Sequence, residues 1–137
     1  MSGSIELPAE VGSVAVARRW ARELLEADDL GPAVDTAVLL VSELVTNVVL
    51  HARTTCTLRI ELGTTVRVEV VDGSEELPEV VVATDPLAPS GRGMRLVEGL
   101  STAFGADALA GGGKRVWFEL DRSVASRSPS PPSAATA

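Results

Sequence analysis

The chain has 137 residues, a formal net charge of −7 and aromatic side chains at only 3% of its positions. This length suits one domain with its own core, and the acidic balance argues against binding nucleic acid or anionic membrane through bulk charge. The scarcity of aromatic residues argues against a platform on which bases stack.

The compartment is indicated by what the sequence lacks. Cys56 is the only cysteine, which excludes an internal disulfide, suits a reducing cytoplasm and favours a small buried side chain. The N-terminus shows no signal-peptide pattern, and no apolar run approaches the roughly 20 residues that span a bilayer. We therefore expect a cytoplasmic protein that does not enter the membrane.

The hydrophobic patterns predict, in chain order, a strand, two helices, a hairpin, a loop, a short helix and a second hairpin. The predicted ranges are a strand at Ser4 to Leu7, helices at Ala9 to about Asp28 and Pro32 to Ala52, a hairpin of Thr54 to Leu62 and Thr64 to Val71, a loop at Asp72 to Gly93, a helix at Gly93 to Ser101, and a hairpin of Thr102 to Leu109 and Lys114 to Asp121. Antiparallel hairpins with helices gathered on one face predict a two-layer α/β sandwich with a mostly antiparallel sheet. We expect this domain to span residues 1–121, followed by a disordered Ser/Pro/Ala-rich tail at 122–137.

The helix from Pro32 to Ala52 is apolar nearly all round, yet it carries Glu43, Asn47 and His51 at four-residue intervals on one face. An amide oxygen can bind Mg²⁺, and a carboxylate one turn away can take a proton from a hydroxyl or water. Taken alone, Glu43 and Asn47 are better explained as a buried polar pair satisfied by neighbouring backbone. His51 is better explained as an imidazole at a helix C-terminus.

Two further segments are candidates for ligand contacts. Ser90 to Met94 opens a helix with two glycines, a pattern that favours an anion cradle with Arg92 as an added charge, although a plain helix-initiating turn fits it too. Asp72-Gly73 ends a strand, where the carboxylate could accept from an exocyclic amine such as that of adenine. A simple strand-ending turn is the alternative. Gly111 to Lys114 lacks the spacing of a P-loop and enters a strand, so we reject that interpretation.

Together these segments resemble the GHKL ATPase family, and within it the short anti-sigma-factor serine/threonine kinases of bacteria, over about residues 4 to 121. Glu43 to Ala52 (ELVTNVVLHA) resembles the N-box, and Asp72 to Ser74 (DGS) lies where the family has its adenine box. Gly91 to Val97 (GRGMRLV) resembles the glycine box, and Gly113 to Leu120 (GKRVWFEL) resembles the closing strand.

The resemblance implies a Bergerat α/β sandwich that binds ATP and Mg²⁺. Glu43 would be the general base, Asn47 would hold Mg²⁺, Asp72 would bind the adenine amine, and residues 74–90 would form a mobile lid over the site. The nucleotide-binding set that it implies is Asn47, Asp72, Ser74, Gly91, Arg92, Gly93, Met94 and Lys114.

The resemblance also implies partners. The main hypothesis is a protein-serine kinase that binds a sigma factor and phosphorylates an anti-anti-sigma antagonist; a homodimer is compatible with it. The alternative is a module that binds ATP or its partner without phosphate transfer. Ser74 and Glu76 favour this alternative, because they occupy two positions where the family's adenine box has glycine. A histidine-kinase fragment is disfavoured because the chain has no helix pair carrying a phosphoacceptor histidine.

Overall fold

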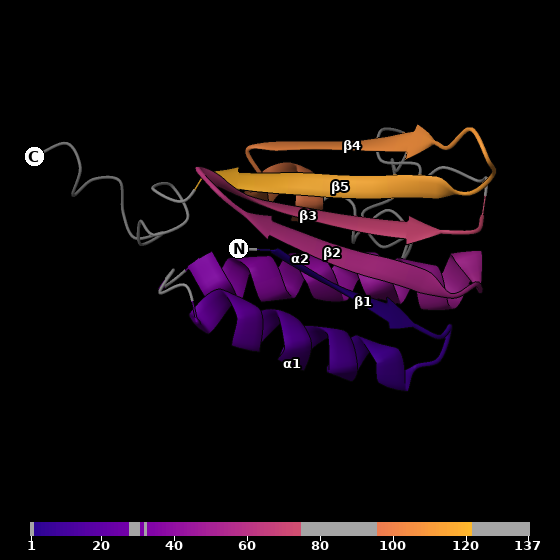
Figure 1. Ribbon diagram of the computed structural model, residues 1–137, viewed down its shortest axis with the longest axis horizontal. Coiled ribbons are helices and arrows are strands. Elements are labelled where there is room, and N and C mark those ends of the chain that lie inside the picture. The colour runs from indigo at the N-terminus through magenta and orange to yellow at the C-terminus, as the bar shows by residue number, and fades with distance from the viewer. Residues whose placement is uncertain (1, 28–30, 32, 75–95, 122–137) are drawn as a thin grey trace, which may run out of the picture.

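The computed structural model describes residues 2–27, 31, 33–74 and 96–121. They form a five-stranded sheet with helices packed on one face, which confirms the predicted two-layer fold (Figure 1). Every strand pair is antiparallel. The elements are β1 (Ser2–Leu7), α1 (Gly12–Glu26), α2 (Ala33–Asn47), η1 (Val48–Ala52), β2 (Cys56–Leu62), β3 (Thr65–Asp72), β4 (Ala103–Ala108) and β5 (Lys114–Asp121), and residues 96–100 are also helical.

The strands lie in the order β1-β2-β3-β5-β4, so the two predicted hairpins are present and are joined through their inner strands. β3 pairs with β5 along its whole length, with Val70 opposite Val116 and Asp72 opposite Lys114. This register places the last residue of β3 directly beside the first residue of β5.

Alternation along the strands builds the core. Val66, Val68 and Val70 of β3 point towards the helices and are almost fully buried, as is Phe118 of β5. Leu40, on α2, is also fully buried. Burying an aliphatic or aromatic side chain of this size stabilises a fold by about 1.5–3 kcal/mol, so this face supplies much of the stability.

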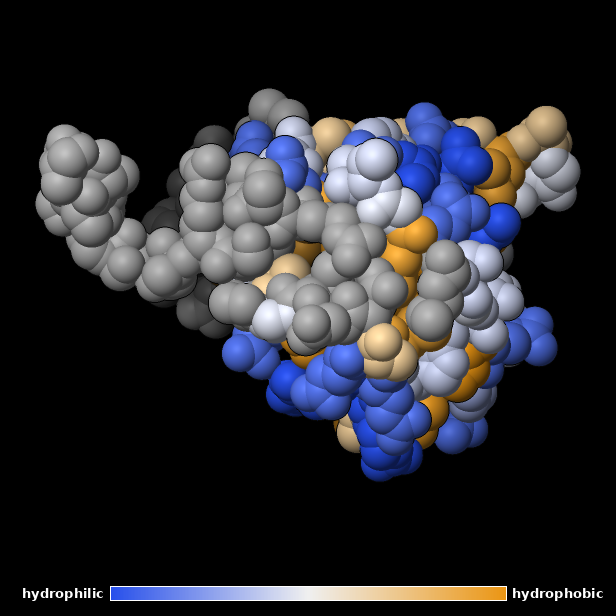
Figure 2. Space-filling view, turned by 60° about the vertical axis from the view of Figure 1, so that its left-hand side comes forward, coloured by the Kyte–Doolittle hydropathy of each residue, from blue (hydrophilic) through white to orange (hydrophobic). Residues whose placement is uncertain are grey.

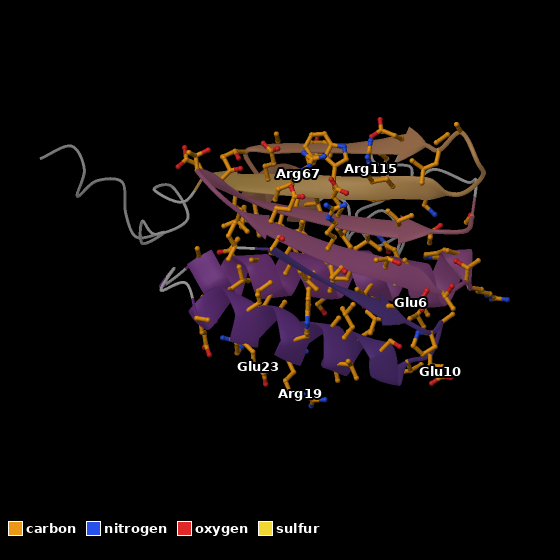
Figure 3. All side chains as sticks on the ribbon, viewed as in Figure 1. Glu6, Glu10, Arg19, Glu23, Arg67 and Arg115 are labelled. Carbon is orange, nitrogen blue, oxygen red and sulfur yellow. The ribbon has the colours of Figure 1, made fainter. Side chains whose placement is uncertain are left out.

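The opposite face of the sheet is polar. The Arg67 guanidinium lies 4.4 Å from the ring centroid of Trp117, and its nitrogens contact Glu69 at 2.9 Å and Glu119 at 2.8 Å. Figure 3 shows Arg67 and Arg115 on the sheet, with Arg19 and Glu23 on the side of α1 that points away from it. On the face seen in Figure 2, hydrophilic residues surround narrow apolar strips. Charged residues therefore bound both outer surfaces, as expected of two layers.

The predicted helix from Pro32 to Ala52 is two elements. α2 is α-helical to Asn47, and η1 continues as a π-helix to Ala52. The Arg53 N–H donates to the carbonyl of Val48 at 2.7 Å, an i to i−5 bond, and Arg53 is left-handed with φ 56°. A π turn widens the helix locally and often occurs near functional sites. Here it follows directly after Asn47.

The helix Ala33–Ala52 is long and apolar enough to span a bilayer, whereas the sequence analysis expected no apolar run of that length. It is the one such helix in the described part of the chain. Ala37, Val41, Leu44 and Val45 are buried in the fold, so its apolar content serves the core.

Candidate functional site

Asp72 and Lys114 form a buried ion pair at one end of the sheet. Lys114 Nζ lies 2.9 Å from Oδ2 of Asp72 and donates to Oδ1 at 3.0 Å. Only 1% of the Asp72 side chain and 10% of the Lys114 side chain are exposed. A buried carboxylate is costly unless it is paired and hydrogen-bonded, and Lys114 supplies that compensation. The sequence placed both residues in one site, and the structure joins them to each other.

The turn after β3 is held by two further hydrogen bonds. The Ser74 N–H donates to Oδ1 of Asp72 at 2.8 Å, so a third predicted site residue joins the pair. The Gly73 N–H donates to the Thr54 hydroxyl at 2.9 Å. Sequence reasoning assigned Thr54 only to a strand and missed this contact. The hydrogen bond between Gly73 and Thr54 links the segment after η1 to the segment after β3.

Cys56 lies opposite Asp72 in the β2–β3 register, on the same face of the sheet. It is buried, as predicted. Burial, with a smaller contribution from the charge of Asp72, raises the pKa of its thiol to about 11. The thiol is therefore neutral at physiological pH, and the surroundings of Asp72 disfavour further negative charge.

Glu43 and Asn47 lie one turn apart on the second half of α2, and both are half-buried. They are thus less enclosed than the sequence suggested, because they border the core-facing surface of the helix instead of lying within it. His51, in η1, is exposed. Within the described ranges, neither Glu43 nor Asn47 has a hydrogen-bond or ion-pair partner for its side chain. Their polar atoms are open to solvent, so a ligand can reach them without breaking a contact with the described protein groups.

The end of α2 and the Asp72–Lys114 pair belong to the same end of the sandwich. In Figure 1, η1, the end of β3 and the beginning of β5 lie together on the right. Only residues 53–55 separate η1 from Cys56, which is paired with Asp72. The candidate site therefore contains Glu43 and Asn47 on the helical layer and Asp72, Ser74 and Lys114 on the sheet. The predicted residues Gly91, Arg92, Gly93 and Met94 lie outside the described residues, as does the expected lid after Ser74.

The fold is a two-layer sandwich with polar side chains where one end of the sheet meets the helix layer. Residues 7–120 match the histidine kinase-like ATPase domain, and the chain belongs to that family. A search of curated proteins gave no match. The fold is similar to the crystal structure of the RsbU and RsbW domains of Rv1364c from Mycobacterium tuberculosis, with a TM-score of 0.63 and 18% identity over 88% of this chain. This chain covers 31% of the length of that solved chain.

An ATPase domain implies ATP binding. Asp72 carries a carboxylate of the kind that accepts from an exocyclic amine, although Lys114 contacts both of its oxygens. Asn47 offers an amide oxygen with no protein partner among the described residues. The same residues contain no group of three His, Cys, Asp or Glu side chains that could hold a metal. A Mg²⁺ ion at Asn47 would therefore take most of its ligands from phosphate oxygens and water, which is its usual preference.

Proposed function

We propose that this protein is an ATP-dependent protein-serine kinase of the anti-sigma type. It binds ATP with Mg²⁺, phosphorylates an anti-anti-sigma antagonist and sequesters a sigma factor. The observation that carries the proposal is the pair Glu43 and Asn47, half-buried one turn apart and without partners in the described part of the chain. Family membership supports ATP as the ligand.

Each residue has a defined role in this reaction. Asn47 holds the Mg²⁺ that neutralises charge on the phosphates, and Asp72 accepts from the adenine amine. Glu43 takes the proton of a serine hydroxyl, whose oxygen bonds to the γ-phosphorus as the bond to ADP breaks. Backbone amides of Gly91 and Gly93 contact the phosphates. Phosphoryl transfer depends chiefly on positioning and charge neutralisation, so this small set of groups suffices.

A second candidate is a module that binds ATP or its partner protein without transferring phosphate. Lys114 engages both oxygens of Asp72, which leaves the carboxylate less available to a base, and this observation favours a module that binds its partner protein without ATP. The two candidates differ in whether Glu43 acts as a base, and only the kinase requires the nucleotide site.

Calorimetric titration with ATP–Mg²⁺ tests the nucleotide site. We expect binding by the wild type and a loss of at least about tenfold in affinity for Asn47→Ala, because the Mg²⁺ ligand is removed. Asp35→Ala is the matched control, since Asp35 lies in the first turn of the same helix and is exposed. Undetectable binding in all three proteins would refute the kinase and leave only a module that binds its partner protein without ATP.

Phosphate transfer separates the kinase from the non-catalytic module. Antagonist proteins are incubated with γ-labelled ATP and either the wild type, Glu43→Gln or Asp35→Asn. The kinase proposal predicts labelled serine with the wild type and Asp35→Asn, and a rate lower by about 10²–10⁴ with Glu43→Gln. Binding of ATP without any labelled antagonist would favour the sequestering module instead.

A further inference from the structure

We propose that Lys114 is an intramolecular competitor of the nucleotide base. In the nucleotide-free protein its ammonium covers Asp72, and a purine binds only when Lys114 moves away. Lys114 would then set the nucleotide affinity. This inference rests on the proposed function, since it takes Asp72 as the acceptor for the exocyclic amine of the base.

The hydrogen bonds at Asp72 leave little room for a base. A carboxylate has about four acceptor positions. Lys114 occupies one on each oxygen, and the Ser74 N–H occupies a second on Oδ1. With 1% of its side chain exposed, Asp72 is closed to an incoming ligand, whereas Lys114 retains 10% and lies nearer the solvent. One acceptor position on Oδ2 remains, and because the side chain is buried, a base that uses it has to displace the ammonium.

Lys114 is the partner that can move. Its charge sits on a flexible four-carbon stem at the first position of β5, and water can receive the ammonium at little cost. Asp72 is fixed, because it is paired in the sheet with both Cys56 and Lys114. Lys114 is also the only lysine in the chain, which otherwise carries its positive side-chain charge on arginine.

If Lys114 competes with the base, its removal should change the nucleotide affinity in the opposite direction to the removal of a phosphate-binding lysine. A base amine is a neutral donor and is weaker than the charge-assisted bonds that it replaces. If a ligand binds only the open state, its apparent affinity is its intrinsic affinity multiplied by the fraction of the protein in that state. Removing Lys114 should therefore tighten nucleotide binding. Simple attraction between a lysine and the phosphates predicts the opposite, since deleting a positive charge weakens binding of a polyanion.

The test compares the wild type, Lys114→Thr and Lys114→Gln by calorimetry with adenosine, ATP–Mg²⁺ and inorganic tripolyphosphate. We expect affinity for adenosine and ATP to rise about tenfold in both variants, with no gain for tripolyphosphate. Arg115→Thr is the matched control, because it removes the same charge from the next residue, on the opposite face of the sheet. Its affinity for adenosine should equal that of the wild type.

Modification of the native protein gives an independent readout. Because Lys114 is the only lysine, an amine-reactive reagent can label one side chain, distinguished from the N-terminus by mass spectrometry of fragments. We expect slow labelling of Lys114 in the free protein and faster labelling when adenosine is added. This measurement does not depend on any variant being folded.

The outcomes separate this inference from the proposed function. Equal or weaker adenosine binding by folded Lys114 variants, or labelling that adenosine slows, would overturn the competitor role while leaving ATP binding intact. Failure of the wild type and of every Lys114 variant to bind any of the nucleotides would overturn both. Binding by the Lys114 variants alone would support the competitor role but would count against the proposed function, which requires the wild type to bind ATP.

Discussion

Gly113 lies directly against Asp72. A Cβ atom at position 113 would collide with the carbonyl oxygen of Asp72, and Gly113 has a φ of 86°, in the region that favours glycine. The turn between β4 and β5 is thereby pressed onto the end of β3. This contact places Lys114, the next residue, where its ammonium reaches the carboxylate.

Gly113→Ala should destabilise the protein by about 2–4 kcal/mol, because it adds backbone strain and a clash with backbone atoms that cannot move away. Gly111→Ala is the control, since a Cβ there meets nothing within 4 Å. We expect it to change the free energy of unfolding by no more than about 0.5 kcal/mol. Urea denaturation measures both, and equal losses would contradict the contact.

Thr54→Val should remove the acceptor of the Gly73 N–H while keeping the volume of the side chain. We expect a loss of about 1 kcal/mol in unfolding free energy and weaker ATP binding, because the turn after Asp72 loses its tether. Thr54→Ser keeps the hydroxyl and should retain most of both. The hydrogen bond would be unimportant if the Val and Ser variants had the same stability and affinity.

The raised pKa of the Cys56 thiol predicts that the protein loses stability at high pH. Its thiol pKa is raised to about 11 in the folded protein, from 9.0, because burial and then Asp72 disfavour the thiolate. The contribution of the neutral Cys56 thiol to the free energy of unfolding is fully present below about pH 9 and is lost as pH rises through about 11. In that window the free energy of unfolding should fall by up to about 1.4 kcal/mol per pH unit more than in Cys56→Ala. Parallel pH curves for the two proteins would disprove this.

Arg67→Ala should cost about 1–2 kcal/mol, because it removes a stacked guanidinium and its contacts with two half-buried glutamates. Arg59→Ala is the matched control on the same face, where Arg59 pairs with Glu61 at 3.1 Å and both side chains are well exposed. Exposed pairs contribute roughly 0–1 kcal/mol. Thermal unfolding compares the two variants, and a larger loss of stability for Arg59→Ala than for Arg67→Ala would contradict this prediction.

Much of the fold was predictable because it follows local patterns. Alternation at Val66, Val68 and Val70 defined a strand with one core face, and the strand now has that orientation. The π turn after Asn47 was not predictable, because the composition of Val48–Ala52 fits an α-helix equally well. Which helical bonds form there is decided by packing and by the left-handed Arg53, not by propensity.

The site was predictable as a set of residues but not as a set of contacts. Asp72 and Lys114 were both expected near a nucleotide, yet their pairing depends on β3 lying beside β5, a register between strands that are not adjacent in the chain. The contact of Thr54 with Gly73 likewise joins two connections, for which sequence patterns carry no signal. Glu43 and Asn47 were identified on one helical face, and their lack of described partners could be known only from the fold.

The central pairing of β3 with β5 also bears on how far the length of the connection between the two strands can vary. Asp72 and Lys114 are 42 positions apart, yet adjacent in the sheet. The entropic cost of closing such a connection grows only with the logarithm of its length, by roughly 0.6 kcal/mol per doubling. A change in the length of the connection between the two strands should therefore cost the sheet and its buried ion pair little free energy.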